Sequence, residues 1–406
     1  MDIKVTAPSV VHGEIRLPFS KSISNRVLLL NKLSKNRLMP ENVAVCDDSE
    51  MMRCALATQS GVVNTGAAGT ATRFSLAYLS MLPGEYELTG SERMKQRPIK
   101  ILVEALRKLG ADIEYLENEG YLPLKIKGKE LQGGEIELSG GVSSQYISAL
   151  LMIAPYTRQG VKLTLTGDII SLPYIKMTIS LMSLYGAAPQ MKGNVITVPV
   201  GRYNPLPYKV EADWSAASYW YGFVALAKEA DVILTGLDNR SIQGDSKVAS
   251  LFTPLGVATE YNDGFVRLRK CNFVNKPYEA DLTDTPDLAQ TLVVAAVMKD
   301  VHFKMSGLQS LRIKETDRIS ALVNEMRKLG FVLDDSIPGT LIWNGERCEE
   351  MQNVEIDTYD DHRMAMSFAI ASYLYPKLKI KSSEVVTKSY PTFWDDLLKV
   401  GFEIER

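Results

Sequence analysis

The chain has 406 residues, 46% of them hydrophobic and 23% charged, which is the composition of a globular protein with an ample core. Its length suggests two or three domains. The net charge of −2 argues against a general nucleic-acid-binding protein, and no apolar run reaches membrane-spanning length. Four cysteines without a CxxC pair and only three histidines argue against a zinc site or a disulfide framework, so we expect reduced thiols in the cytoplasm.

Six segments predict helices that are apolar on nearly every side. A helix of this kind is buried in the core of its domain. In chain order the segments are 23–33, 70–82, 144–154, 215–227, 286–298 and 361–373.

Amphipathic helices are predicted between these segments, each ending at a glycine. Before Gly330 the residues Ile319, Leu322, Met326 and Leu329 recur at spacings of 3, 4 and 3, which places them on one helical face. Similar patterns precede glycines 110, 186, 256 and 401, and a weaker one, 50–60, precedes glycine 61. Short alternating stretches after most of these glycines predict strands. The nearly regular period indicates six α/β units, three per domain.

Polar residues crowd the N-termini of the buried helices. Serine, threonine and aspartate are favoured caps at such ends, and for Asp213 we expect capping. Capping does not explain the cations Lys21, Arg73 and Arg363, because positive charge is unfavourable at a helix N-terminus. Cations there are consistent with a bound anion, and several helix N-termini can converge on one polyanionic small molecule.

The sequence Lys-Glu-Thr-Asp-Arg at 314–318 is predicted to start the helix that ends at Gly330. Lys314 and Arg318 would then lie where backbone N–H groups and the helix dipole favour an anion, with the carboxylate of Glu315 between them. This mixture suits chemistry on an anionic substrate that also needs a proton moved. The alternative is a solvated, charged first turn.

Six ordered motifs together resemble the EPSP synthase family of enolpyruvyl transferases, nearly from end to end of the chain. They are LPFSKSISNR at 17–26, AGTATR at 68–73, RMKQRPI at 93–99, VSSQ at 142–145, KETDR at 314–318 and DHRMAM at 361–366. The resemblance implies an α/β fold of two similar domains, each of three βαβαββ units, with the active site in the interdomain cleft. The domains would be 19–209, and 1–18 plus 210–406.

The resemblance also implies a reaction. The enolpyruvyl group of phosphoenolpyruvate would pass to the 5-hydroxyl of shikimate 3-phosphate, giving 5-enolpyruvylshikimate 3-phosphate and phosphate, on the pathway to chorismate and aromatic amino acids. Both substrates carry phosphate and carboxylate groups, which accounts for the many cations. We expect no metal or organic cofactor, no nucleic-acid or membrane partner, and a monomer.

The match implies a role for each site residue. Asp287 would be the base, kept ionised by the surrounding cations; Glu315 would be the acid at carbon; and Lys21 would assist. The residues implied for shikimate 3-phosphate are Lys21, Ser22, Arg26, Ser143, Ser144, Gln145, Ser171, Asp287, Ser310 and Lys314. Those implied for phosphoenolpyruvate are Lys21, Gly69, Arg97, Gln145, Arg318, Arg363 and Lys388. A side chain at position 69 would intrude on the bound substrate.

The chain departs from the usual family pattern at Phe19, Ala67, Phe74 and Ser310, and none of these removes a proposed catalytic group. Two other functions stay open. A UDP-N-acetylglucosamine enolpyruvyl transferase would typically show Ala-Lys-Asn and a loop cysteine, where this chain has Ser-Lys-Ser and no cysteine in 85–97. A non-catalytic anion-binding relative would lack Asp287, Glu315 or Lys21. The glycine-rich segment 66–70 lacks P-loop spacing.

Overall fold

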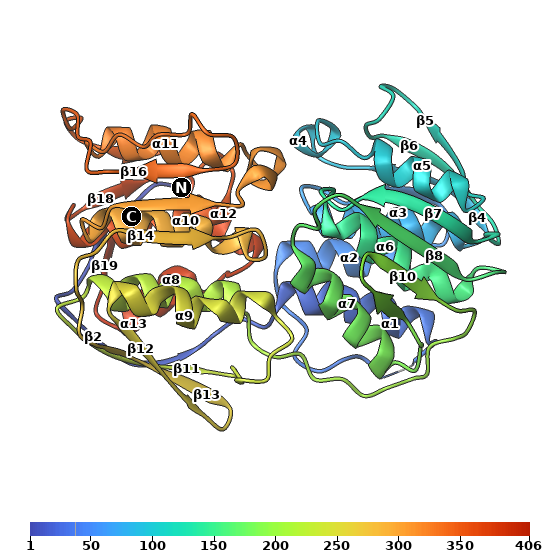
Figure 1. Cartoon of the computed structure of the whole chain (residues 1–406), viewed down its shortest axis with the longest axis horizontal. Helices are drawn as coiled ribbons and strands as arrows, with labels where there is room; N and C mark the ends of the chain where they lie inside the picture. Colours follow the sequence, from blue (N-terminus) through green and yellow to red (C-terminus); the bar gives the residue numbers. More distant parts are fainter. Residues whose placement is uncertain (37) are drawn as a thin grey trace. The chain divides into compact units, whose positions relative to one another are not determined.

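The computed structural model describes residues 1–36 and 38–406, which form two compact units (Figure 1). One unit combines Met1–Phe19 with Glu211–Arg406, and the other is Ser20–Val210. These boundaries lie one residue from the domain limits expected from the sequence, 19–209 and 1–18 plus 210–406. None of the helices in the described ranges combines the length and the hydropathy needed to cross a membrane.

The unit Ser20–Val210 contains two four-stranded sheets, ordered β3-β4-β6-β5 and β7-β8-β10-β9. In each sheet the first two strands are parallel, because a helix connects them, and the other pairs are antiparallel. The strands are β3 (Gly61–Asn64), β4 (Gly84–Thr89), β5 (Asp112–Tyr115), β6 (Leu124–Gly128), β7 (Gly134–Ser139), β8 (Val161–Thr166), β9 (Gln190–Lys192) and β10 (Val195–Val198). The helices are α1 (Lys21–Leu33), α2 (Asp47–Ala57), α3 (Gly69–Met81), α4 (Glu92–Lys95), α5 (Lys100–Lys108), α6 (Ser144–Ile153), the 3-10 turn η1 (Ala154–Tyr156) and α7 (Leu172–Leu184).

The other unit contains three sheets, ordered β12-β13-β11-β2, β14-β15-β16 and β17-β18-β1-β19. Strand β1 lies between β18 and β19, with Lys4 opposite Glu405, so both ends of the chain belong to one sheet. The strands are β1 (Ile3–Thr6), β2 (Val10–Arg16), β11 (Glu229–Thr235), β12 (Val257–Asn262), β13 (Phe265–Lys270), β14 (Tyr278–Asp281), β15 (Phe303–Ser306), β16 (Leu341–Trp343), β17 (Glu355–Ile356), β18 (Leu378–Ile380) and β19 (Glu403–Glu405).

The helices of this unit alternate with 3-10 turns. They are α8 (Trp214–Leu226), η2 (Gly244–Lys247), α9 (Val248–Phe252), η3 (Thr253–Leu255), η4 (Pro286–Leu288), α10 (Ala289–Met298), η5 (Gln309–Ile313), α11 (Arg318–Lys328), α12 (His362–Phe368), η6 (Ala369–Tyr373), η7 (Ser383–Lys388) and α13 (Phe393–Lys399). Figure 1 labels α8, α10 and α12 within it, and these three helices contact one another.

The buried helices agree with the sequence prediction. All six form, as α1, α3, α6, α8, α10 and α12, with small shifts at their ends. The 286–298 and 361–373 segments each contain a 3-10 turn, η4 before α10 and η6 after α12. Residues 289–297 of α10 are at most 1% exposed, and Trp214 and Trp220 of α8 are fully buried. A helix without a polar face thus forms the core of each unit.

The glycine pattern is confirmed at five of its six positions. Glycines 110, 186, 256, 330 and 401 follow helices and have φ between 82° and 102°, the left-handed conformation that ends helices and that L side chains rarely adopt. The prediction for Gly61 is wrong. Helix α2 ends at Ala57, and Gly61 is the first residue of β3.

The predicted start of the helix before Gly330 is also wrong. Helix α11 begins at Arg318, because the carboxylate of Asp317 caps it by accepting from the backbone N–H of Ser320 at 3.1 Å. Lys314 lies in extended backbone after η5. Lys314 and Glu315 are therefore in the turn before the helix, and only Arg318 occupies its first position.

The six repeats are unequal in their sheets. Five repeats carry a sheet of three or four strands. In the repeat that contains α1 and α2, strand pairing within the described residues is reduced to an isolated bridge between Glu41 and Lys209. In the repeat that contains α11, the stretch after Gly330 forms only isolated bridges among the described residues, Phe331 with Arg347 and Asp334 with Ile342. The α/β class with repeated parallel pairs is as expected.

Candidate active site

In the unit formed by Met1–Phe19 and Glu211–Arg406, four segments bring four cationic and three carboxylate side chains together. Asp287 lies on η4, Lys314 and Glu315 lie in the turn before α11, and Lys388 is the last residue of η7. The others stand at helix starts: Arg318 on α11, and Asp361 and Arg363 at the N-terminus of α12. These seven side chains are called the charged cluster below.

Arg318 is the centre of the charged cluster. Its side chain is 2% exposed and reaches all three carboxylates. Nε and Nη2 donate to Asp361 at 2.7 and 3.3 Å, Nη1 donates to Asp287 at 3.1 Å, and Nη2 donates to Glu315 at 3.0 Å. Burial opposes the charge of Arg318, but Asp361, Glu315 and Asp287 outweigh it and raise the pKa of the guanidinium.

Asp287 is surrounded by cations. Its carboxylate lies 3.1 Å from Nη1 of Arg318, 3.1 Å from Nη2 of Arg363 and 3.7 Å from Nζ of Lys314. Burial works against ionisation, yet Arg363, Lys314 and Arg318 together hold the pKa of Asp287 far below its usual range. The expectation that cations keep this carboxylate ionised is therefore supported.

Glu315 is held between two cations of the charged cluster. One carboxylate oxygen accepts from Arg318, and the other lies 3.5 Å from Nζ of Lys388. The Glu315 side chain is 14% exposed and that of Lys388 is 10% exposed. Solvent can therefore reach the Glu315 side chain, although its two ion pairs hold it in position.

In the unit Ser20–Val210, Lys21 is paired with a carboxylate that the sequence analysis did not assign. Its Nζ lies 3.0 Å from Asp48, whose side chain is 4% exposed. Lys21 is the first residue of α1, where the helix dipole disfavours a cation, so the carboxylate of Asp48 offsets that cost. Asp48 stands in the first turn of α2, a position where the sequence alone indicates only a favourable helix start.

Arg26 is also buried, but its partners are neutral. Nε donates to Thr178 at 2.7 Å, Nη1 to the carbonyl oxygen of Ser22 at 2.8 Å, and Nη2 to Ser148 at 3.2 Å. No carboxylate forms an ion pair with it within the described ranges. Burial lowers the pKa of Arg26 to about 10.

Gly69 and Arg97 lie against each other. A Cβ atom at position 69 would come within 2.8 Å of Nη1 of Arg97, so the space at this glycine is occupied by the guanidinium. Arg97 is 8% exposed, and its buried Nε has no hydrogen-bond partner in the described structure. Glycine at 69 thus has a steric reason in the structure, which is the guanidinium of Arg97. The expected intrusion of a side chain on the bound substrate stays a prediction.

The expected phosphate-binding residues mark two further helix starts. Ser143 caps α6, Ser144 is its first residue, and Gln145 donates from Nε2 to Thr70 at 3.0 Å. Ser171 precedes α7 and has a left-handed backbone with φ 55°. Such a conformation is strained for a serine and is found preferentially at functional sites. Two helix N-termini therefore present hydroxyls and N–H groups.

Two other sequence expectations, and the histidine beside Asp361, can be placed. Asp213 caps α8, accepting from Ser215 N at 2.8 Å, which confirms the capping role. Ser310 lies half-buried on η5. His362 is 1% exposed, and its Nδ1 lies 3.6 Å from Asp361. Asp361 was not assigned a role from the sequence, and the only signal was its position before a buried helix.

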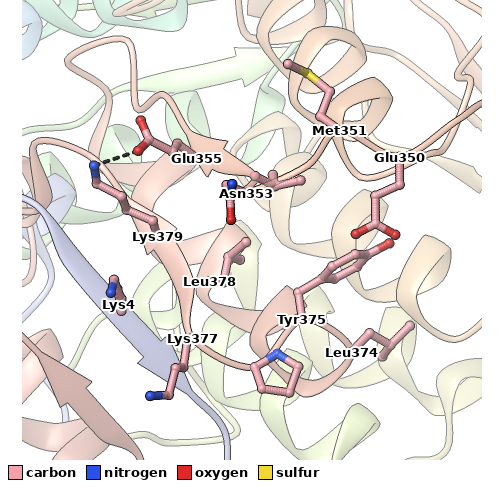
Figure 2. Close-up of a pocket in the computed structure, with 12 residues that line it drawn as sticks. Lys4, Glu350, Met351, Asn353, Glu355, Leu374, Tyr375, Lys377, Leu378 and Lys379 are labelled. Carbon is pink, nitrogen blue, oxygen red and sulfur yellow. Dashed lines mark hydrogen bonds and ion pairs between the residues drawn. The ribbon is translucent and has the colours of Figure 1, made fainter.

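A hollow of about 640 Å³ lies elsewhere in this unit, along β17, β18 and the segment before them (Figure 2). Its three lysines are already paired with carboxylates: Lys379 with Glu355 at 2.6 Å, and Lys377 and Lys4 with Glu405 at 3.1 and 3.9 Å. None of the seven side chains of the charged cluster lines it. The hollow is therefore not a candidate for the expected chemistry.

Comparisons with known proteins identify the family of the chain. The model of the family "EPSP synthase (3-phosphoshikimate 1-carboxyvinyltransferase)" matches residues 54–397. A 3-phosphoshikimate 1-carboxyvinyltransferase of Bacteroides fragilis is 52% identical over 99% of this chain and 98% of its own, and one of Photobacterium profundum is 35% identical over 97% of each. The fold matches EPSP synthase of Acinetobacter baumannii with a TM-score of 0.78 and 19% identity over the whole of both chains. The chain belongs to the EPSP synthase family.

Proposed function

We propose that this chain transfers the enolpyruvyl group of phosphoenolpyruvate to the 5-hydroxyl of shikimate 3-phosphate, releasing phosphate. Family membership supports the reaction. The observation that carries it in the structure is the carboxylate of Asp287 held between Arg318 and Arg363. That arrangement provides an ionised base directly beside cations suited to an anionic substrate.

The proposed chemistry has an addition step and an elimination step. In the addition, the 5-oxygen bonds to C2 of phosphoenolpyruvate, Asp287 takes the hydroxyl proton, and Glu315 gives a proton to C3. In the elimination, the bond from C2 to the phosphate oxygen breaks and the phosphate leaves with the proton held by Asp287, while Glu315 takes a proton back from C3, which restores the enol and both carboxyl groups. Lys21 assists these transfers. The two carboxylates take opposite roles because their surroundings differ.

The cations of the charged cluster are proposed to bind phosphoenolpyruvate. Arg318, Arg363 and Lys388 each already contact a carboxylate, at 2.7–3.5 Å. A phosphate or carboxylate of the substrate would share these donors, and a guanidinium can bind such a group through two parallel hydrogen bonds. Sharing Lys388 and Arg318 with the substrate would weaken their hold on Glu315, which frees that side chain to act as an acid. Lys314 is proposed to bind shikimate hydroxyls.

The unit Ser20–Val210 is proposed to bind anionic groups as well. Ser143, Ser144 and Ser171 offer hydroxyls at two helix starts for the 3-phosphate. Arg26 has only neutral partners, so it can accept a substrate carboxylate, with Ser22 beside it. Arg97, whose Nε is unpartnered in the described structure and whose Nη1 lies against Gly69, is proposed for phosphoenolpyruvate. Gln145 and Lys21 are proposed for both substrates.

The test is phosphate release by the purified protein with both substrates and with each omitted in turn. Release that requires both supports the proposal. Binding of both ligands in calorimetry without release would support the non-catalytic relative instead, and release only with UDP-N-acetylglucosamine would support the other transferase. A cytoplasmic location and a monomeric state remain predictions, which fractionation and sedimentation would check.

A further inference from the structure

Arg73 is a cation near a helix N-terminus that the proposed reaction does not use. It lies just over one turn into α3, and the residue is 3% exposed. Positive charge is unfavourable at this end of a helix, and the sequence alone offered a bound anion as the reason for it. The hydrogen bonds of Arg73 give a different reason, because they join α3 to the segment that carries Arg97.

One nitrogen of the Arg73 guanidinium holds the start of its own helix. Nη1 donates to the carbonyl oxygen of Gly69 at 3.2 Å. Gly69 is the first residue of α3 and the residue against which Arg97 packs, since a Cβ atom there would lie 2.8 Å from Nη1 of Arg97. Arg73 therefore fixes the backbone on which the Arg97 guanidinium rests.

The same guanidinium reaches the residues on either side of Arg97. Nη1 also donates to Sδ of Met94 at 3.0 Å, and Nη2 donates to the carbonyl oxygen of Pro98 at 3.5 Å. The backbone N–H of Arg97 in turn donates to the carbonyl oxygen of Met94 at 3.1 Å. Arg97 thus extends from a turn, Met94 to Pro98, whose two ends are both held by Arg73.

Tyr146 on α6 supports this turn as well. Its hydroxyl donates to the carbonyl oxygen of Pro98, which is the acceptor that it shares with Arg73. The Arg73 guanidinium also lies over the Tyr146 ring, with Cζ 5.9 Å from the ring centroid. Tyr146 is 6% exposed and Met94 is 1% exposed. These contacts are therefore shielded from water, where hydrogen bonds are stronger.

The chemistry of arginine suits this place. Its guanidinium is a rigid, planar fork of five N–H donors, so one side chain can bind acceptors on separate segments. The three acceptors on Arg73 are two carbonyl oxygens and a thioether sulfur, all neutral groups of the protein. A lysine would keep the charge, but its single nitrogen could not span α3 and the turn in the same way.

Resting on the proposed function, we infer that Arg73 is a positioning residue for phosphoenolpyruvate that acts through Arg97. It fixes both the glycine against which the Arg97 guanidinium packs and the turn from which the Arg97 side chain extends. The Nε of Arg97 is buried and unpartnered in the described structure, so the guanidinium depends on these surroundings for its orientation. Without Arg73, the Arg97 side chain would populate other rotamers and bind the substrate anion less tightly.

The experiment measures phosphate release by Arg73→Lys as a function of each substrate. Misplacing a binding group by about 1 Å can cost about a hundredfold, so we expect the KM for phosphoenolpyruvate to rise by about tenfold to a hundredfold. The KM for shikimate 3-phosphate, to which Arg97 does not contribute, and kcat should change little. Equal increases in the two KM values would indicate a general loosening of the unit and would overturn the inference.

Arg107→Lys is the matched control. Arg107 lies on α5, donates to the carbonyl oxygen of Ile113 at 2.6 and 3.1 Å, and lies over the ring of Tyr115 at 5.1 Å. These are the same kinds of contact that Arg73 makes, but they do not involve Gly69 or the turn at Met94 to Pro98. The control should leave both KM values unchanged.

A double-mutant cycle separates positioning from direct binding of the substrate. If Arg73 acts through Arg97, then Arg73→Lys should raise the KM for phosphoenolpyruvate far less in an Arg97→Lys background than in the wild type. If Arg73 binds the substrate anion itself, the two fold-changes should multiply. Multiplication would contradict the inference.

Tyr146→Phe is a second variant, which decides the question if Arg73→Lys does not fold. It keeps the ring and removes the other donor to the carbonyl oxygen of Pro98. The KM for phosphoenolpyruvate should rise in the same direction as in Arg73→Lys, by a smaller factor. An unchanged KM would show that holding this turn does not matter for the substrate.

Hydrogen exchange without substrates keeps this inference separate from the proposed function. Absence of phosphate release by the wild type would defeat the proposed function. In that case the backbone amides of 93–99 should still exchange faster in Arg73→Lys than in the wild type, with no such change in Arg107→Lys. Unchanged exchange in 93–99 would show that Arg73 does not hold the turn, and the inference would then be wrong whatever the activity of the wild type.

Discussion

Arg318 and Arg26 are both almost completely buried near the start of a helix, yet the chain neutralises only one of them. Arg318 contacts three carboxylates, which raise its pKa. Arg26 contacts hydroxyl and carbonyl oxygens, and burial lowers its pKa to about 10. A buried cation is costly unless it is paired. Arg26 is therefore suited to receive an anion from outside, whereas Arg318 also organises the carboxylates that move protons.

The largest expected effect comes from breaking the paired arginine. Arg318→Met would leave Asp361, which is fully buried, without its guanidinium partner. We expect a loss of about 3–5 kcal/mol in the free energy of unfolding, as for other broken buried ion pairs. Urea denaturation measures it. Arg267→Met removes a partly exposed pair and should cost much less, because exposed ion pairs are screened by solvent. Equal losses in the two variants would contradict the central place given to Arg318.

The charge state of Asp245 gives the next largest effect. Its pKa is raised to about 7 in the folded chain, so between about pH 4 and pH 7 the folded state holds a proton that the unfolded state has lost. Stability contributed by this group is present below about pH 4 and is lost as the pH rises to about 7. Asp245→Asn should abolish that loss, so the variant should gain roughly 2–4 kcal/mol relative to wild type between pH 4.5 and pH 7.5.

Urea denaturation at a series of pH values checks this prediction. Only the difference between variant and wild type is diagnostic, because other groups titrate in both proteins. A difference that does not change with pH would mean that Asp245 is ionised in the folded chain throughout the range.

A smaller effect is expected at Arg97, which lies beside Gly69. In Gly69→Ala the new methyl group would meet Nη1 of Arg97 at 2.8 Å and displace the guanidinium. We expect the KM for phosphoenolpyruvate to rise by roughly tenfold to a hundredfold, an effect of about 1.4–2.7 kcal/mol. Gly201→Ala, where a Cβ meets nothing within 4 Å, serves as the control. An unchanged KM in Gly69→Ala would remove Arg97 from the proposed substrate contacts.

The smallest effect tests the neutral partners of Arg26. Thr178→Val removes the hydroxyl that accepts from Nε at 2.7 Å and keeps the shape of the side chain. Leaving that donor unsatisfied should cost about 1–3 kcal/mol in the free energy of unfolding. Saturating shikimate 3-phosphate should recover part of the loss if its carboxylate binds Arg26. Ser183→Ala, on the exposed side of the same helix, should be neutral, and a recovery equal in both variants would argue against the contact.

The buried helices could be predicted because their signal is local. Segment 289–298, for example, has no polar face, so its burial follows from its own residues. The start of α11 was misplaced because two acceptable starts lie close together, and the capping hydrogen bond of Asp317 decides between them.

The partners of the candidate residues could not be predicted in the same way. Arg26 is held by Ser148 and Thr178, which lie 122 and 152 residues away in the chain. The pairing of Lys21 with Asp48, and of Arg318 with Asp361, also depends on how helices pack. The residues that carry the chemistry were recognisable from motifs, but the charge state of each depends on neighbours that only the fold supplies.

The most direct test of this account is phosphate release by Asp287→Asn with phosphoenolpyruvate and shikimate 3-phosphate. The variant keeps the shape of the side chain and the contacts that neutral oxygen can make, but it cannot accept the hydroxyl proton. We predict a loss in kcat of about 10²- to 10⁴-fold, with both substrates still bound in calorimetry. A variant that binds both substrates and retains wild-type kcat would show that Asp287 is not the base.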